Sequence, residues 1–85
     1  MKLIEKNSGR VVEFHMYMLD TENMVRSNDI ADDFFAGTDG VVDDVDYCVE
    51  YVKDWVDSTG DFYGVDDGLW RKAEINGELY TNYGL

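Results

Sequence analysis

Carboxylates are the residues of this chain whose spacing points most clearly to a chemical role. Five of them recur at intervals of three or four residues, which would place them on one face of a helix: Asp43, Asp46, Glu50, Asp54 and Asp57. At ~1.5 Å of rise per residue this row is ~21 Å long, so its five charges are ~5 Å apart on average. One strand of B-DNA presents a phosphate every ~3.4 Å. The row can therefore offer a regular line of negative charge to Lys and Arg side chains, as a DNA strand does.

Two tyrosines, Tyr47 and Tyr51, flank these carboxylates on one side and lie one helical turn apart. Aromatic side chains supply the apolar anchoring that charge alone does not give to an interface, and Phe35 or Phe62 is expected to add to it. Other acids that precede or follow the row are expected to support the same surface: Asp32, Asp33, Asp61, Asp66 and Asp67. Together these residues form the candidate partner-binding site.

Catalysis is not expected from these residue types. His15 is the only histidine, and no serine or cysteine stands near it in sequence. A carboxylate on an open helix face has no apolar pocket that would raise its pKa. The stretch that begins at Asp57 fails the EF-hand pattern, because Phe62 and Gly68 replace the required glycine and glutamate. We expect no enzyme, no cofactor and no metal site, with weak Ca²⁺ or Mg²⁺ binding by Asp61, Asp66 and Asp67 in the loop 57–68 left open.

The negative charge is confined to one part of the chain. The 85 residues carry seven Lys and Arg against 19 Asp and Glu, a net charge of −12. Residues 27–69 hold 13 of these acids and one base, Lys53, so they account for all of the −12. A surface that binds nucleic acid or an anionic membrane needs Lys and Arg, so neither function is expected. A basic protein is the natural electrostatic partner, and a solvated face that serves only solubility is the simpler alternative.

The carboxylates can form a row only if they lie on a helix. The pattern of Gly40–Ser58 predicts this helix. Opposite the acids, an arc roughly 120° wide holds the apolar residues, as in a helix that packs on a core: Val41, Val45, Cys48, Val49, Val52, Trp55 and Val56. Asp39 is expected to be the N-cap, and Gly60 is expected to follow the last turn.

The segment before this helix predicts two strands and a short helix. Residues 2–6 and 11–19 should pair as a hairpin, with Val12, Phe14 and the later even-numbered positions buried. A short helix is expected to end near residue 36, capped by one of the polar residues 27–29.

After the long helix, residues 69–75 and 78–83 predict a second hairpin. Its turn, Asn76-Gly77, is the strongest hairpin signal in the chain, although the pattern leaves open which face of these strands is buried. The sequence thus predicts one small α+β domain over residues 1–85, in the order β-β-α-α-β-β. An antiparallel sheet of undetermined strand order would carry one long, acidic, amphipathic helix on one face.

The charge pattern of residues 27–69 resembles that of the acidic inhibitor proteins of phages and mobile elements, which include anti-restriction proteins, anti-CRISPR proteins and the uracil-DNA glycosylase inhibitor. This resemblance implies a DNA-mimicking inhibitor that blocks the nucleic-acid site of a basic host defence protein, such as a CRISPR effector or a restriction enzyme. Two alternatives remain open. One is an acidic antitoxin or regulatory module that inhibits a basic enzyme without mimicry, and the other is a structural phage component.

Residues 1–6 reach charged side chains too early to form the apolar region of a signal peptide, and no apolar run approaches membrane-spanning length. We therefore expect an intracellular protein, and the resemblance implies the cytoplasm of a bacterial host cell. It would act as a monomer or a homodimer without contacting a membrane.

Overall fold

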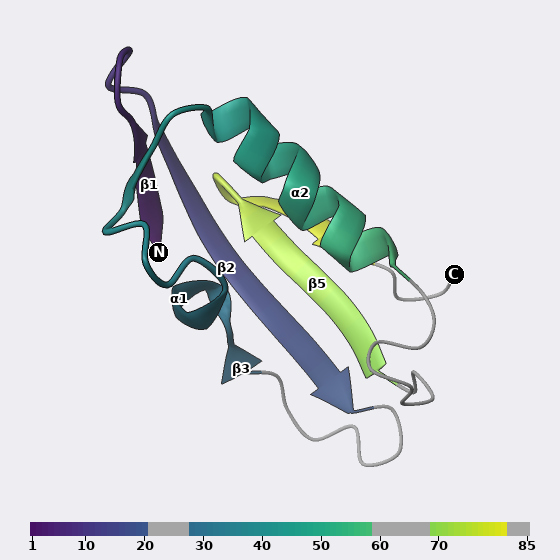
Figure 1. The fold of residues 1–85 in the computed structure, drawn as a ribbon. Coiled ribbons are helices and arrows are strands. Elements are labelled where there is room, and N and C mark those ends of the chain that lie inside the picture. The colour runs from purple at the N-terminus through teal and green to yellow at the C-terminus, as the bar shows by residue number, and fades with distance from the viewer. Residues whose placement is uncertain (21–27, 59–68, 82–85) are drawn as a thin grey trace.

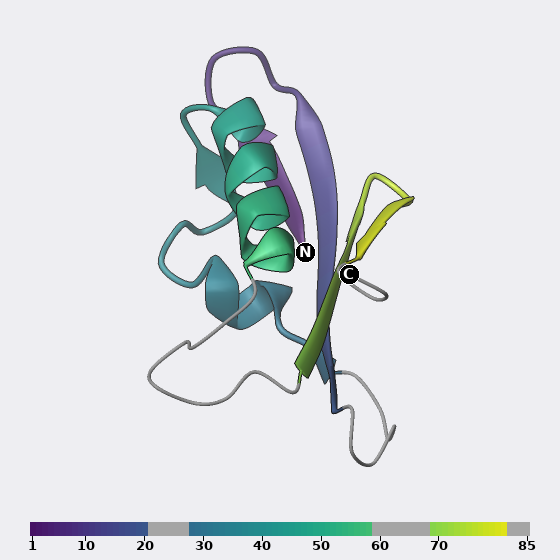
Figure 2. The ribbon, with the colours of Figure 1, turned by 90° about the vertical axis from the view of Figure 1, so that its right-hand side faces the viewer.

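A sheet forms one layer of the molecule, and both helices lie on the same face of it (Figures 1 and 2). The computed structural model describes residues 1–20, 28–58 and 69–81. The strands are β1 (Lys2–Glu5), β2 (Val11–Asp20), β3 (Asn28–Asp29), β4 (Val41–Val42), β5 (Leu69–Ile75) and β6 (Glu78–Thr81). The helices are the short α1 (Ala31–Phe34) and the longer α2 (Val45–Asp57). The predicted α+β class is confirmed.

Strand β2 is the central strand of the sheet. The order is β4-β1-β2-β5-β6, and β3 pairs with β2 outside this path. The predicted hairpin of β1 and β2 is confirmed, because these strands pair antiparallel from Lys2 opposite Glu13 to Ile4 opposite Val11. Strand β4 runs parallel to β1, so the prediction of a purely antiparallel sheet is wrong at this edge.

The core lies between the sheet and α2. On β2 the even-numbered residues Val12, Phe14 and Met16 are buried, as the two-residue period of a strand predicts, and Met18 is half-buried. The buried hydrophobic residues of the described chain are Leu3, Val12, Phe14, Met16, Ala31, Phe35, Val45, Val52, Val56, Ala73 and Ile75. They come from one face of the sheet, from α1 with its C-cap residue, and from one side of α2, which fixes the rotation of α2 about its axis.

The second hairpin forms at the predicted turn. Asn76 and Gly77 have φ angles of 51° and 81°, the left-handed values that a two-residue hairpin turn requires. The structure also decides which face is buried. Ala73 and Ile75 point into the core, whereas Leu79 of β6 is exposed.

Helix α2 begins later than the sequence predicts. Its N-cap is Asp44, whose Oδ1 accepts a hydrogen bond from the backbone N–H of Tyr47 at 3.1 Å, and the expected cap, Asp39, lies in the preceding turn with a φ of 54°. Val41 and Val42 form β4 instead of the first helical turn. Two β-branched residues suit a strand better than a helix, and β1 provides the partner with which they pair. The predicted element order and helix length are therefore wrong at this point.

Two contacts fix the ends of α2 to the sheet. At its start, the carboxylate of Glu5 accepts a hydrogen bond from the backbone N–H of Val45 at 3.0 Å, which satisfies a donor that a helix leaves unpaired. At its end, the buried Arg71 of β5 donates to the carbonyl oxygen of Ser58 and lies 5.8 Å from the ring centroid of Trp55. Neither described helix is long and apolar enough to cross a membrane.

Candidate functional site

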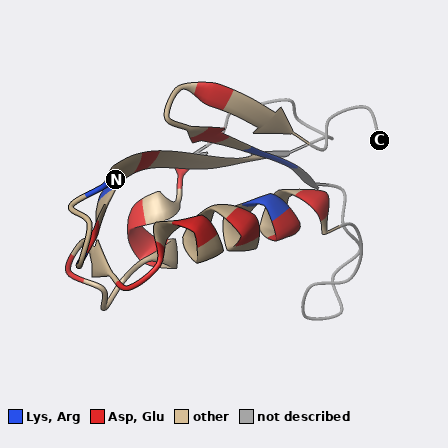
Figure 3. Ribbon diagram, turned by 90° about the horizontal axis from the view of Figure 1, so that it is seen from above, with Lys and Arg blue, Asp and Glu red and all other residues tan. Residues whose placement is uncertain are grey.

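Four acidic residues recur along α2 (Figure 3), and all four are exposed. They are Asp46, Glu50, Asp54 and Asp57, here called the α2 row. The opposite face carries the buried Val45, Val52 and Val56. The predicted separation of acids from valines around the helix is thus confirmed. At ~1.5 Å per residue the α2 row extends for ~16 Å.

Asp43, the first of the five expected carboxylates, is exposed but lies before the N-cap and outside α2. The helix therefore presents four acids with ~4.5–6 Å of axial rise between neighbours, because they are three or four residues apart. The α2 row is shorter than expected, and its charges are more widely spaced along the axis than the phosphates of a DNA strand.

Part of the charge in the α2 row is balanced within the molecule. An Arg10 nitrogen lies 2.5 Å from a carboxylate oxygen of Asp46, and Lys53 Nζ lies 3.8 Å from Glu50. The hydrogen bond from Arg10 lowers the pKa of Asp46 and holds it ionised. Asp54 and Asp57 make no ion pair with any residue in the described ranges. The uncompensated charge therefore lies in the C-terminal half of α2.

The Arg10–Asp46 pair was not predicted. Arg10 lies in the turn between β1 and β2, 36 residues before Asp46 in sequence. Only the pairing of β1 with its neighbours brings that turn to the start of α2. No local sequence pattern carries this information.

Aromatic rings form a continuous cluster beside the α2 row. Tyr47 and Tyr51 are 68% and 54% exposed, and their stacked rings are 6.3 Å apart between centroids, as their one-turn spacing predicts. The Tyr51 ring lies 5.4 Å from that of Phe34, which in turn lies 6.1 Å from that of Trp55. The α1 residue at the surface of this cluster is Phe34, whereas the expected anchor Phe35 is buried against Phe14.

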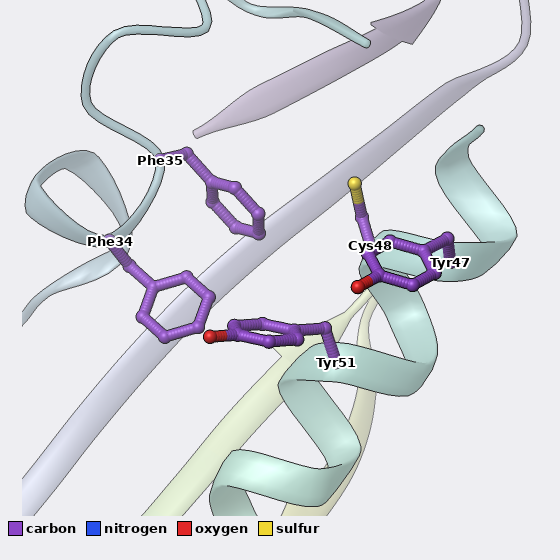
Figure 4. A pocket seen from close by; sticks show the side chains of 5 residues that line it. All are labelled: Phe34, Phe35, Tyr47, Cys48 and Tyr51. Carbon is purple, nitrogen blue, oxygen red and sulfur yellow. The ribbon is translucent and has the colours of Figure 1, made fainter. Parts of the chain in front are cut away.

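Two adjoining hollows open between α1 and α2, and together they are called the aromatic groove. The first has a volume of about 330 Å³ and is lined by Phe34, Phe35, Tyr47, Cys48 and Tyr51 (Figure 4). The second, of about 230 Å³, is lined by Phe34, Tyr51, Asp54, Trp55 and Ser58. The groove therefore shares a residue, Asp54, with the α2 row.

The supporting acids divide into two groups. Asp32 and Asp33 are exposed on α1, the helix that supplies Phe34 to the groove. The expected contributions of Asp61, Asp66, Asp67 and Phe62 fall outside the described residues.

Cys48, which was expected on the buried arc of the helix, is half-buried and lines the first hollow. Burial, with a smaller contribution from the charge of Asp44, raises the pKa of its thiol. A thiol that stays protonated is a poor nucleophile, so Cys48 acts here as a small apolar wall residue.

His15 lies on the face of β2 opposite the helices, away from the α2 row. Its two ring nitrogens are 2.7 Å from Asp29 and 2.9 Å from Glu13. These hydrogen bonds, that of Asp29 first, raise the pKa of His15 and favour its protonated form. The arrangement links β2 to β3 by charge. Sequence spacing could not reveal it, because Asp29 comes from a different strand.

Within residues 1–20, 28–58 and 69–81, no three His, Cys, Asp or Glu side chains are placed to hold a metal ion. The described surface of α2 presents exposed carboxylates beside the exposed rings of Tyr47 and Tyr51. A comparison of the chain with protein-family models, with curated proteins and with solved structures found no match.

Proposed function

We propose that this protein is a DNA-mimicking inhibitor that uses the α2 row to occupy the nucleic-acid-binding site of a basic protein. A host defence protein of the CRISPR-effector or restriction-enzyme kind is the expected target. The observation that supports this most is the line of exposed carboxylates on α2, of which Asp54 and Asp57 have no ion-pair partner among the described residues. Such a line complements the Arg and Lys side chains that contact DNA phosphates.

The position of these acids argues against a role in solubility alone. Asp54 and Asp57 lie in the last turns of α2, where the negative end of the helix dipole disfavours carboxylates by about 0.3–1 kcal/mol each. Glu50 and Asp54 are like charges one turn apart and repel each other by about 0.2–0.5 kcal/mol. Acids placed elsewhere on the surface would give the same solubility at a smaller cost in stability, so we attribute their location to binding.

The second candidate function is a module that inhibits a basic enzyme without imitating DNA. The aromatic groove favours it, because exposed Tyr47 and Tyr51 have no counterpart on a DNA backbone. The axial spacing of ~4.5–6 Å in the α2 row, wider than that of phosphates, favours it as well. The two functions share the same surface and differ in whether DNA competes for the target.

Affinity capture with DNA competition separates these functions. The protein is immobilised, exposed to a bacterial lysate at low salt, and then washed with duplex DNA at constant ionic strength. Mimicry predicts that DNA releases the captured protein, and that capture falls steeply as salt rises, because screening weakens contacts between exposed charges. A captured protein that binds DNA and the inhibitor at the same time would support the second function. Capture of no basic protein at low salt would contradict both.

A further inference from the structure

The aromatic groove has a composition that charge mimicry does not explain. Both hollows are bordered by the rings of Phe34 and Tyr51, and the second also contains the carboxylate-bearing Asp54. Figure 4 shows the Phe34 and Phe35 rings on one side, facing Tyr51 and Cys48 on the other. The first hollow, of about 330 Å³, is at the small end of the range of ligand pockets, ~300–1,000 Å³, and the second, which Asp54 lines, is smaller at about 230 Å³. A single long side chain is therefore a better match to this space than a large ligand.

We propose that the aromatic groove receives an arginine side chain of the basic partner, with its guanidinium stacked on Tyr51 and its charge facing Asp54. This rests on the proposed function, because it names the chemistry by which the partner would be held at the same surface.

Charge complementarity identifies the occupant as a cation. Aromatic faces are negative, and they attract a cation that lies within about 6 Å of the ring centroid. Asp54 lines the groove, and Asp32 and Asp33 are exposed on the adjacent helix. Lys53 is the only Lys or Arg between residues 28 and 58, and it lies towards Glu50 and over the ring of Tyr80 on β6. Arg71 of β5 also contacts the lining residues Trp55 and Ser58, but it is buried and donates to the carbonyl oxygen of Ser58, so the exposed charges at the groove are acidic. An anionic ligand would be repelled here, and a neutral apolar one would desolvate Asp54 without compensation.

Arginine fits this chemistry better than lysine. Its planar guanidinium is weakly hydrated, stacks on aromatic rings and can donate two hydrogen bonds to one carboxylate. The molecule already contains such a contact, because Arg71 lies 5.8 Å from the ring centroid of Trp55. Trp55 is thus already in contact with Arg71 of the same molecule. Tyr51, whose side chain is largely exposed, is the ring that a partner would contact.

A second copy of the chain is a poor occupant. Each copy carries a net charge of −12, so two copies repel one another as their acidic faces approach. The groove is lined by residues of the same acidic segment, and self-association there would bring Asp54 of each copy close to like charge.

The test is an NMR titration that needs no knowledge of the partner. N-acetyl-arginine-N′-methylamide is the probe, and its citrulline analogue, which has nearly the same shape without the charge, is the comparison at equal ionic strength. The expected result is saturable shifts of Phe34, Cys48 and Tyr51 signals with the arginine compound, at an affinity several-fold higher than with the citrulline compound. Tyr51→Leu and Asp54→Asn should each weaken binding roughly three- to fivefold. Their matched controls, Leu79→Ala and Glu78→Gln, remove an exposed apolar group and a charge from β6 and should leave binding unchanged.

Four results would overturn the proposal. They are equal affinity for the citrulline compound, shifts confined to Asp46 and Glu50, absence of saturable shifts, and concentration-dependent shifts of groove signals in the protein alone. These results are distinguishable from a failure of the proposed function, since DNA competition for a captured protein is measured separately. If DNA competes for the captured protein but Tyr51→Leu binds the arginine compound as well as the wild type does, the α2 row would be the binding surface and the aromatic groove would not be part of it.

Discussion

At the scale of single residues, ion pairs and hydrogen bonds join groups that are far apart in sequence. Arg10 reaches Asp46, and His15 lies between Glu13 and Asp29. Neither arrangement could be predicted, because each depends on which strands become neighbours. The flanking positions of Tyr47 and Tyr51 beside the α2 row could be predicted, because both follow from the helical period within one element.

The His15 cluster predicts a stability that depends on pH. Hydrogen bonds to Asp29 and then to Glu13 raise the folded-state pKa of His15 above 6.5. A raised pKa means that the stabilisation is complete below the unfolded-state pKa and is lost as pH rises through the folded-state value. We therefore expect the free energy of unfolding to fall between about pH 6 and about pH 8. Urea unfolding of the wild type and of His15→Gln at both pH values checks this.

In His15→Gln the free energy of unfolding should change less between these two pH values than in the wild type. Glutamine can keep a hydrogen bond but cannot gain a proton. An identical pH dependence in the variant and the wild type would show that His15 is not the group responsible.

At the scale of elements, the boundary of α2 is where sequence and structure differ most. The period of the valines predicts the buried face of the helix correctly, yet it includes Val41, which forms β4 together with Val42. The local pattern does not distinguish the two outcomes, because β4 exists only through its pairing with β1. The Asn76-Gly77 turn was predictable to the residue, because its left-handed φ angles are a local requirement.

Adjacent aspartates at the start of α2 provide a direct test of this boundary. Asp44→Ala removes the N-cap hydrogen bond to the N–H of Tyr47 and should destabilise the protein by about 1 kcal/mol. Asp43→Ala, its matched control, changes an exposed residue outside the helix and should stay within about 0.5 kcal/mol of the wild type. Chemical unfolding measures both. A larger loss for Asp43→Ala than for Asp44→Ala would mean that the helix begins earlier.

A charge reversal in the C-terminal turn of α2 should raise the stability of the fold and weaken binding to a partner. Asp57→Lys replaces an unfavourable charge at the negative end of the helix dipole with a favourable one, so it should stabilise the fold by about 0.3–1 kcal/mol. Binding to a basic partner should weaken at the same time. Thermal unfolding and capture from lysate measure the two effects. A destabilised variant would contradict the dipole argument, and unchanged capture would show that Asp57 lies outside the interface.

At the scale of the whole molecule, the α+β class and the packing of an acidic helix on a sheet follow from composition and periodicity. The parallel pairing of β4 with β1 and the contact of α1 with α2 through Phe34 and Tyr51 do not, because both are tertiary contacts. The same distinction applies to the candidate site. Its acids could be predicted from spacing, whereas its aromatic groove needs two helices placed side by side.

The central claim is that the α2 row, and not the total charge, binds a basic partner. The measurement that tests it is the affinity of charge-reversed variants for the protein captured from lysate. Asp54→Lys combined with Asp57→Lys, and the control Glu74→Lys combined with Glu78→Lys on β5 and β6, each change the net charge from −12 to −8, because every substitution adds two. Thermal unfolding verifies that both variants fold.

We expect the row variant to bind at least about a hundredfold more weakly, because each ion pair at the interface becomes a like-charge contact that can cost several kcal/mol. The control should bind within a few-fold of the wild type. Equal affinities of the two variants would contradict the account, since they would show that the partner responds only to overall charge.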